Sequence, residues 1–410
     1  MSEKVRIDSI GRQGDGVADT PQGRVHVAYT LPGEDVEITR DGDRGALTTF
    51  VMPRPNPNRI EPVCRHFTLC GGCALQHWKA EPYLAWKRLQ VSEALARADV
   101  KAEVAETIPA HGEGRTRAVF HAGRGEKKED LGFAIRRSHE VVPIEECPVL
   151  DPKLEAALPV ARELARMLVP MRKPVDLHFT IAQLGFDIDI RGPGKLVAAV
   201  ESKVVRFAAE NKILRISLHG EPLAQLAAPS RLIGAVRVHF PPAAFFQATQ
   251  EGERVLAEKV LEAAEGAKSA ADLFSGVGTF ALRLASKTRT AAFDNHAPSI
   301  AALQAAAKSP GLKPVSASAR DLFRWPLVAD ELRHFDFVVL DPPRQGAEAQ
   351  VRELAKSKVK KIAYVSCDAD TFARDARVLI DGGYKLGKVT PVDQFRYSPH
   401  VELVAVFSAK

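Results

Sequence analysis

Short apolar runs alternate with helical segments from about residue 268 to the end of this chain. The runs predicted to be strands are Ala271–Phe274, Thr290–Asp294, Val315–Ala317, Phe335–Asp341, Lys361–Cys367 and Val401–Phe407. Because parallel neighbours need a crossover helix between them, this alternation predicts an α/β fold with a mostly parallel, doubly wound sheet. Such sheets bind ligands at the carboxyl ends of their strands. The residues that follow these runs are therefore the first candidates for a site.

Two further kinds of segment precede this region. A chain of 410 residues is too long for one core, so two or three domains are expected. Residues 1–58 hold short alternating runs between turns, which is typical of a small β-barrel, and prolines 53, 55, 57 and 62 mark a linker. Residues 59–240 predict a central mixed α+β domain, with helices over 81–98, 154–168 and 203–210. Residues 241–410 complete the division as the α/β domain.

The composition gives no sign of a membrane or secreted protein. Residues 1–12 lack a secretory signal pattern, and no apolar run reaches the roughly 20 residues that span a bilayer. Five cysteines, odd in number and unevenly spread, argue against a disulfide framework, so we expect a cytoplasmic protein. The net charge of +6 leans weakly towards an anionic partner. No obligate protein partner is evident.

The cysteines divide into a group of four and a single one. Cys64, Cys70, Cys73 and Cys147 form a metal-ligand set that suits either zinc or an iron–sulfur cluster. Cys367 stands apart, at the end of a predicted strand. A thiolate there suits a nucleophile, although most free cysteines are small buried residues.

A glycine turn follows the first strand of the α/β region, in Asp272-Leu-Phe-Ser-Gly-Val-Gly278. Glycines let the backbone approach a ligand, and the helix that follows offers free N–H donors. Asp294 ends the next strand, where a carboxylate can bind a ribose, and Asp341 ends a later one. This set predicts a nucleoside cofactor.

Three motifs together resemble the RNA 5-methyluridine (uracil-5-)-methyltransferase family. They are the glycine turn just described, Leu340-Asp-Pro-Pro-Arg344, and the stretch from Ser366 to Asp375. Phe245-Phe246-Gln247 and His400-Val401-Glu402 resemble two further family motifs. The likeness covers nearly the whole chain. It implies a TRAM-type, OB-like β-barrel over residues 1–58, a [4Fe–4S] cluster on the four grouped cysteines, and a C-terminal Rossmann-like class I methyltransferase domain.

The resemblance also implies a cofactor and roles for single residues. S-adenosylmethionine would be the methyl donor, held by Gln247, Phe274, Thr279, Asp294, Asp321 and Asp341. Cys367 would be the nucleophile and Glu402 the base. Uracil C5 is a poor nucleophile until a thiolate adds to C6, and a base must then remove the C5 proton. Arg374 is a candidate activator of the thiol because it lies near Cys367 in the sequence.

The RNA substrate follows from the same resemblance. Iron–sulfur members of the family include enzymes of large-subunit rRNA, so 23S rRNA is the first choice and tRNA the alternative. An RNA-binding protein with a silent catalytic domain is the alternative from another class, although the presence of both Cys367 and Glu402 argues against it. Five arginines are candidates for phosphate contacts: Arg115, Arg117, Arg124, Arg136 and Arg137.

Overall fold

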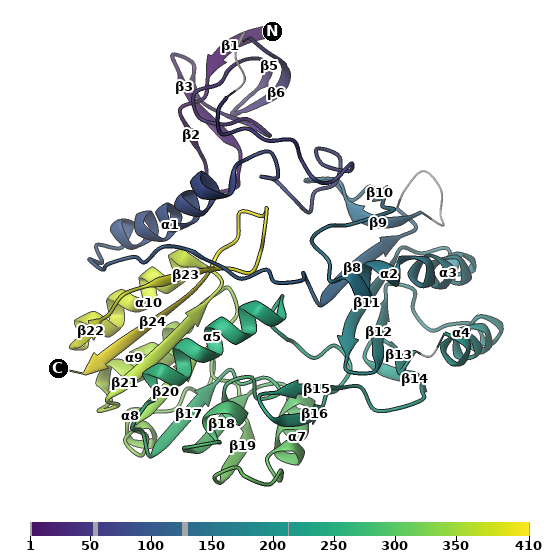
Figure 1. Cartoon of the computed structure of the whole chain (residues 1–410). Coiled ribbons are helices and arrows are strands. Elements are labelled where there is room, and N and C mark those ends of the chain that lie inside the picture. The colour runs from purple at the N-terminus through teal and green to yellow at the C-terminus, as the bar shows by residue number, and fades with distance from the viewer. Residues whose placement is uncertain (1, 52–55, 125–129, 212, 410) are drawn as a thin grey trace.

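The computed structural model describes residues 2–51, 56–124, 130–211 and 213–409. The strands of these residues form four sheets, which Figure 1 shows in three bodies joined along the chain. The N-terminal sheet stands at one end, a central sheet lies beside the C-terminal one, and helix α1 (Ala80–Arg97) lies between the N-terminal and C-terminal sheets. The predicted linker prolines 53 and 55 lie outside the described residues.

The N-terminal sheet has six strands in the order β1-β5-β6-β4-β3-β2. Their bounds are β1 (Ser2–Arg6), β2 (Ser9–Ile10), β3 (Gly16–Thr20), β4 (Gly23–Val27), β5 (Asp35–Asp41) and β6 (Arg44–Phe50). Alternate side chains point to one face, so the sheet encloses a small core of its own that includes Ile7, Val25 and Ile38. The chain therefore begins with a β-rich region, as predicted.

The central sheet has seven strands in the order β10-β9-β8-β11-β12-β13-β14. The strands are β8 (Arg117–Ala122), β9 (Leu131–Ala134), β10 (Val141–Pro143), β11 (Val175–Ala182), β12 (Gly185–Arg191), β13 (Arg215–Leu218) and β14 (Glu221–Gln225). Its helices are α2 (Pro152–Ala156), α3 (Leu158–Leu168), the 3-10 turn Val169–Met171, and α4 (Ala198–Glu210). A hairpin of β15 (Ser230–Ile233) and β16 (Val236–His239) leads on to the last sheet.

The C-terminal sheet has nine strands, ordered β19-β18-β17-β20-β21-β24-β23-β7 with β22 paired to β24. These are β7 (Ile108–Pro109), β17 (Ser269–Leu273), β18 (Arg289–Asp294), β19 (Val315–Ala319), β20 (Phe337–Leu340), β21 (Lys361–Ser366), β22 (Tyr384–Leu386), β23 (Thr390–Asp393) and β24 (Glu402–Ala409). The neighbouring strands β19, β18, β17, β20 and β21 run parallel, and β24 is antiparallel to β21. Its helices are α5 (Gln250–Ala263), α6 (Ala281–Leu284), α7 (Ala297–Ala306), α8 (Ala329–Leu332), α9 (Glu348–Lys356) and α10 (Ala369–Asp381).

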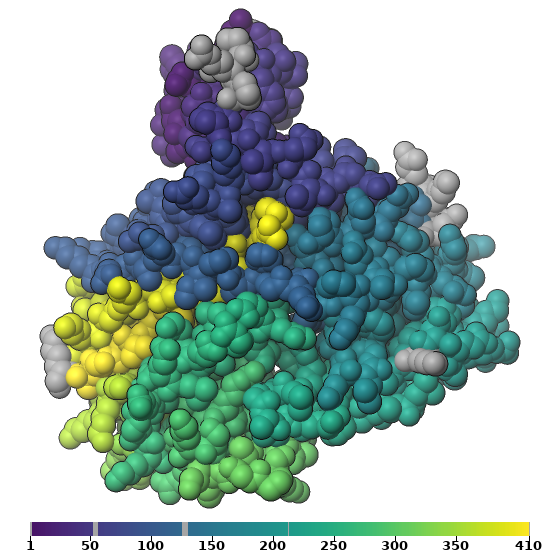
Figure 2. Space-filling view, in the orientation of Figure 1, coloured from purple at the N-terminus to yellow at the C-terminus, as the bar shows by residue number. Residues whose placement is uncertain are grey.

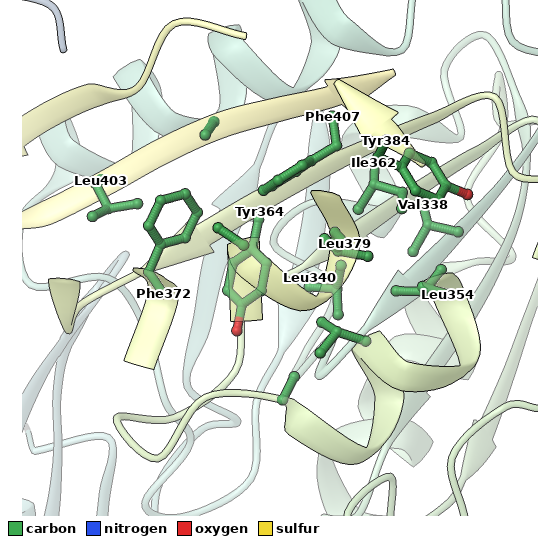
Figure 3. Close-up of a cluster of buried hydrophobic side chains, with 14 of the residues drawn as sticks. Val338, Leu340, Leu354, Ile362, Tyr364, Phe372, Leu379, Tyr384, Leu403 and Phe407 are labelled. Atoms are coloured by element: carbon green, nitrogen blue, oxygen red, sulfur yellow. The ribbon is translucent and has the colours of Figure 1, made fainter. Parts of the chain in front are cut away.

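Helices cover both faces of the C-terminal sheet. On one face, side chains of α9 and α10 pack on β20, β21 and β24, as Figure 3 shows for Leu354, Phe372 and Tyr364. On the other face, α5 packs through Leu256 and Val260. The strands buried between these layers are mostly apolar, as expected of a parallel sheet covered on both faces. The predicted α/β fold of this region is thus confirmed.

Two features differ from the expected organisation. The helix expected over 154–168 is two helices, because Pro159 stands in the first turn of α3 and cannot continue α2. Helix α1 and strand β7, which we placed with the central residues, pack instead against α10 and β23. The division into three domains stays a prediction. None of the helices within the described ranges is both long and apolar enough to cross a bilayer.

Candidate active site

The strand register brings the predicted catalytic residues to one edge of the C-terminal sheet. Ser366, the last residue of β21, pairs with Leu403 of antiparallel β24. The next position along this register sets Cys367 opposite Glu402, so both side chains lie on the same side of the sheet. Asp341 follows β20, the parallel neighbour of β21. Three residues that are far apart in the sequence therefore meet at the carboxyl ends of β20 and β21.

Cys367 is a half-buried thiol in the resting protein. Burial raises its pKa to about 12, and the nearby carboxyls of Glu402 and Asp341 add to the rise. One feature favours the thiolate instead: the Arg344 guanidinium, whose charge lowers the pKa of Cys367. At the start of α10, the Asp368 carboxylate binds the N–H groups of Asp370 and Thr371, and its charge raises the pKa of Cys367. The sulfur therefore needs help from a bound partner before it can attack.

The activator suggested by sequence proximity is engaged elsewhere. Arg374 binds the carboxylate of Asp375 at 2.7 Å and the carbonyl of Gln345 at 3.0 Å. Arg344 takes its place near the sulfur, with its Nη2 3.2 Å from His400 Nε2. The Pro-Pro-Arg motif that follows Asp341 thus contributes a cation whose role the sequence did not reveal.

Two carboxyls beside the sulfur belong to one chain of hydrogen bonds. Gln247 Nε2 donates to Asp341 Oδ2 at 2.9 Å. Gln394 Nε2 donates both to Gln247 Oε1 and to Glu402 Oε2, each at 2.8 Å. The Oε1 atom of Gln394 accepts from the Ala248 N–H at 3.0 Å. Gln394 is only 1% exposed, and sequence reasoning missed it.

The two acids share a water-poor site and therefore titrate as a pair. Loss of water around its carboxyl raises the pKa of Asp341 well above the usual value, and the charge of Glu402 raises it further. Burial raises the pKa of Glu402 to about 7, while the bond from Gln394 opposes that rise. Repulsion between the two carboxylates therefore favours a single proton shared by the pair, and the hydrogen bond from Gln394 favours the ionised form of Glu402.

The glycine turn contains polar atoms that have no hydrogen-bond partner among the described residues. Asp272 Oδ2 accepts from the Ala281 N–H at 2.7 Å, but its Oδ1 and the Oγ of Ser275 are buried without a hydrogen bond in the described part of the chain. Burial raises the pKa of Asp272 to about 8. Gly276 has a φ of +52°, and nothing lies within 4 Å of the place where its side chain would stand. Orphaned polar atoms beside open space fit a polar ligand such as a nucleoside.

The other predicted cofactor residues surround the same turn. Asp294 accepts from the N–H groups of Gly276 and His296 at 2.9 and 2.8 Å, so its carboxylate is fixed at the end of β18. Phe274 adopts a φ of +67°, and its ring centroid lies 5.3 Å from that of Phe323. Asp321 caps the turn that holds Phe323, by accepting from its N–H at 3.0 Å. Thr279 is buried at the end of the turn.

The four grouped cysteines lie near one another, from two separate segments. Gly71 N–H binds the carbonyl of Ala134, which ties the loop of Cys64, Cys70 and Cys73 to β9. Burial raises the pKa of Cys147 to about 12, and each of the other three thiols contributes to that rise. No disulfide joins them. Across the described ranges, no three His, Cys, Asp or Glu side chains are placed as a formed metal site, so the cluster stays a prediction.

Most of the arginines predicted to contact phosphate are already paired. Arg136 and Arg137 bind the buried carboxylate of Asp15 at 2.5 and 2.9 Å, and Arg124 binds Asp176 at 2.9 Å. Arg117 donates to the carbonyl of Phe246 at 3.2 Å and has no carboxylate partner among the described residues. The charge of Arg115 acts to lower the pKa of Cys70, Cys73 and Lys87. The last two arginines therefore remain available to an anion.

Comparison with known proteins gives consistent matches. Residues 235–410 match the model of a family described as tRNA (uracil-5-)-methyltransferase. Over 99% of its length the chain is 46% identical to an uncharacterized RNA methyltransferase of Caulobacter vibrioides, all of which is covered. It is 45% identical to another from Brucella suis, with 99% of this chain and 97% of the relative covered.

Two more distant matches carry specific names. The 23S rRNA (uracil(1939)-C(5))-methyltransferase RlmD of Vibrio vulnificus is 27% identical, with 99% of this chain and 96% of the relative covered. The solved structure of Pyrococcus abyssi tRNA (uracil-54, C5)-methyltransferase, in complex with S-adenosyl-L-homocysteine, matches with a TM-score of 0.76 at 22% identity. That match covers 98% of this chain and 99% of the other, and it shows a shared fold.

Proposed function

This chain belongs to the S-adenosylmethionine-dependent RNA (uracil-5-)-methyltransferases, and we propose that it methylates C5 of one uridine in 23S rRNA. The observation that carries the proposal is the meeting of Cys367, Glu402 and Asp341 at one edge of the C-terminal sheet. This reaction needs a thiol, a carboxylate base and a site for the methyl donor, and the glycine turn with its unpartnered polar atoms is the candidate for that site.

Cys367 begins the reaction by adding to C6 of the uracil. The thiolate forms the S–C6 bond with its own electron pair and displaces the electrons of the C5–C6 double bond, so that C5 becomes nucleophilic. C5 would then take the methyl group of S-adenosylmethionine, and S-adenosylhomocysteine would leave with the electrons of the broken S–CH3 bond. Glu402 then removes the proton from C5, the double bond forms again, and the S–C6 bond breaks to release the thiolate. The hydrogen bond from Gln394 favours the ionised form of Glu402, which is the form that can accept this proton.

The residues around the glycine turn fit the methyl donor. Gln247, Phe274, Thr279, Asp294, Asp321 and Asp341 are the residues proposed to hold S-adenosylmethionine, with Asp294 on its ribose. When bound, S-adenosylmethionine supplies the methyl group and a positive sulfonium charge, which favours the ionised forms of nearby acids and thiols. The charge of Arg344 acts on Cys367 in the same direction.

We propose three parts for the molecule. Residues 1–58 form a TRAM-type barrel that binds RNA, residues 59–240 a central domain, and residues 241–410 a Rossmann-like class I methyltransferase domain. We also propose that Cys64, Cys70, Cys73 and Cys147 hold a [4Fe–4S] cluster, because four unbridged thiols from two segments are a suitable donor set. Zinc remains the alternative on spacing alone. The cytoplasmic location stays a prediction.

The choice of 23S rRNA is supported by the full-length similarity to a relative that carries that name. The deciding experiment incubates the purified enzyme and labelled S-adenosylmethionine with unmodified 23S rRNA and tRNA transcripts. We expect 5-methyluridine in the 23S transcript, and the same modification to be missing from a deletion strain. Methylation of tRNA alone would replace the proposed substrate, and methylation of neither would refute the proposed activity.

Two substitutions test the chemistry itself. Cys367→Ala should form no covalent adduct with RNA that contains 5-fluorouridine, whereas the wild-type enzyme should form one. Glu402→Gln should accumulate an RNA-linked species and release it at least about 10²-fold more slowly, because only the base step is lost. Exposed Glu262→Gln serves as a matched control. Wild-type turnover by either active-site variant would contradict the assigned role.

A further inference from the structure

Two arginines lie side by side next to the proposed active site, without an acid to neutralise them. Arg117 begins β8, and Arg231 lies in β15. Arg231 Nη2 donates to the Thr116 hydroxyl at 3.0 Å, and Arg117 Nη1 donates to the carbonyl of Phe246 at 3.2 Å. Within the described ranges, neither guanidinium has a carboxylate within ion-pair distance.

The pair is held in place by aromatic rings. The Arg231 guanidinium carbon lies 4.5 Å from the centroid of the Phe246 ring, and that of Arg117 lies 5.3 Å from the centroid of Phe245. Both cations therefore surround the dipeptide Phe245-Phe246, which directly precedes Gln247. Both arginines contact Phe246. The next residue, Gln247, donates to Asp341 and so belongs to the hydrogen-bond chain of the proposed active site.

The charges of the pair are poorly compensated. Burial lowers the pKa of Arg117 to about 10, and the charge of Arg231 lowers it further. Burial also lowers the pKa of Arg231, while the charges of Glu253 and Asp151, which lie beyond ion-pair distance, partly oppose that shift. The Nη1 atom of Arg231 is buried and has no hydrogen-bond partner in the described part of the chain. Burying two guanidinium charges close together, with one N–H donor left without a partner, costs free energy. A bound anion would offset that cost by pairing with both charges.

An exposed aromatic ring completes the arrangement. The Phe245 side chain is 65% exposed although large apolar side chains are usually covered. One face of its ring is near Arg117, and its exposed surface can take a flat apolar partner. Proteins that bind single-stranded nucleic acid combine these two features, cations for the phosphates and aromatic rings for the bases.

We propose that Arg117 and Arg231 bind the phosphodiester of a nucleotide that flanks the target uridine, with the base of that nucleotide stacked on Phe245. The inference rests on the proposed function, since it assumes an RNA substrate. A uridine must leave its stack to reach Cys367, and a grip on the adjoining backbone holds the strand while it does so. The two arginines would thus position the RNA without touching the reacting atoms.

The test uses the full-length enzyme and whichever transcript, 23S rRNA or tRNA, the wild type methylates. Arg117→Gln, Arg231→Gln and Arg231→Lys are compared with Arg333→Gln, a surface arginine paired with Asp330. We expect each glutamine variant to raise KM for RNA severalfold with kcat little changed. The slope of log K against log salt should fall by about 0.7, the value for one contact to a single strand. Arg231→Lys should keep the slope. Phe245→Ala should weaken RNA binding with the salt slope unchanged.

Binding of S-adenosylhomocysteine reports on folding and distinguishes a role in cofactor binding from a role in RNA binding. It should be the same in all variants. If Arg231→Gln weakens that binding and leaves the salt slope unchanged, the pair serves the cofactor and the proposal is wrong. Wild-type KM and slope in both glutamine variants would overturn it too. A wild-type enzyme that methylates neither transcript would refute the proposed function, which is a separate outcome.

Discussion

A single buried glutamine decides how the two acids of the proposed active site share a proton. Gln394 donates to Glu402 and to Gln247, and Gln247 in turn donates to Asp341. An amide N–H stabilises the ionised form of a carboxyl and so lowers its pKa. Gln394 therefore favours the ionised form of Glu402, the form a base needs, against the burial that raises its pKa to about 7.

We predict that Gln394→Met shifts the acid limb of the pH–rate profile to higher pH. The base must be ionised, so the rate falls as the pH drops through the pKa of Glu402. Removing the donor raises that pKa further, and the limb should move up by about one pH unit, since a hydrogen bond to a charged group contributes about 1.5 kcal/mol. The measurement is kcat against pH for wild type and variant.

Two further variants make this test specific. Gln350→Met removes an equally buried amide, bound to the backbone of Leu327, and should lower stability without moving the limb. In Gly252→Ala, the new Cβ would stand 2.6 Å from Gln394 Oε1, so the amide must shift and the limb should move as in Gln394→Met. An unmoved limb in both Gln394→Met and Gly252→Ala would show that Gln394 is merely structural.

The sequence predicted the residues of this site that stand in motifs, and it missed those that depend on tertiary contacts. Asp341 and Cys367 directly follow strands β20 and β21, and Glu402 is the first residue of β24. The apolar pattern of all three strands is visible in the sequence. Gln394 and Arg231 show no such local sign. Gln394 binds Glu402, 8 residues away, and Gln247, 147 residues away, while Arg231 binds Thr116, 115 residues away. Arg374 was a candidate activator by proximity alone, with a structural salt bridge as the alternative, and the structure shows it paired with Asp375.

At the scale of elements, helix α1 anchors the loop that leads into β24. Lys87 of α1 is fully buried, and its Nζ binds Asp393 Oδ1 at 2.6 Å and the carbonyl oxygens of Phe395 and His400. The Tyr83 hydroxyl donates to Asp393 Oδ2 at 2.9 Å. The anchored loop reaches the surface between α1 and the central part, in yellow in Figure 2. The start of β24, and with it Glu402, thus depends on α1.

We predict that Lys87→Met lowers the free energy of unfolding by about 3 kcal/mol, because it leaves the buried Asp393 carboxylate without its cation. Denaturant unfolding measures the change. Burial lowers the pKa of Lys87 to about 8, so the lysine is still charged at pH 7, where the comparison is made. Resolution of the RNA adduct should slow as well, since the base is less well held.

The matched variants for this helix are Glu93→Gln and the double variant Lys87→Met with Asp393→Asn. Glu93 forms an exposed pair with Arg97, so its loss should change stability by less than about 1 kcal/mol. The double variant should recover part of the lost stability, because no uncompensated charge remains. Full additivity of the two single changes would contradict a direct coupling between Lys87 and Asp393.

The elements were predicted best where their pattern is strong. All six strands predicted after residue 268 are present, as is α1 within one residue at each end. Strand β11 was not predicted, although residues 175–181 alternate apolar and polar side chains. The strands from β13 to β16 were not predicted either, because four or five residues are too few to show a clear period. The short strand β7 has two residues and exists only because β23 offers a free edge.

At the scale of the whole molecule, the loop of residues 64–75 contacts all three parts. The Tyr29 hydroxyl of the N-terminal part binds the carbonyl of Thr68 at 3.2 Å. Gly71 binds Ala134 of the central sheet, and the N–H groups of Ala74 and Leu75 bind the carbonyl of Tyr397, just before β24. Anything that fixes this loop therefore fixes the three parts relative to one another.

We predict that anaerobically purified protein is brown and contains about four iron and four sulfide per chain, as expected for a [4Fe–4S] cluster. Cys147→Ser should lower the iron content and the Tm, because the cluster would join the loop to the central part. Cys367→Ser is the matched control, and it should keep the iron. A colourless preparation that contains only zinc would contradict the cluster and favour the other metal.

The turn of residues 11–15 in the N-terminal sheet touches both remaining parts of the chain. Asp15 lies between Arg136 and Arg137 of the central part, while Arg12 pairs with Asp370, three residues beyond Cys367. These contacts thus hold the N-terminal sheet, which would bind the RNA, at a fixed distance from the Cys367 sulfur. If the N-terminal part binds RNA as proposed, this fixed distance would limit which uridine of the bound strand can reach the sulfur. The target would then be selected partly by its distance from the bound segment.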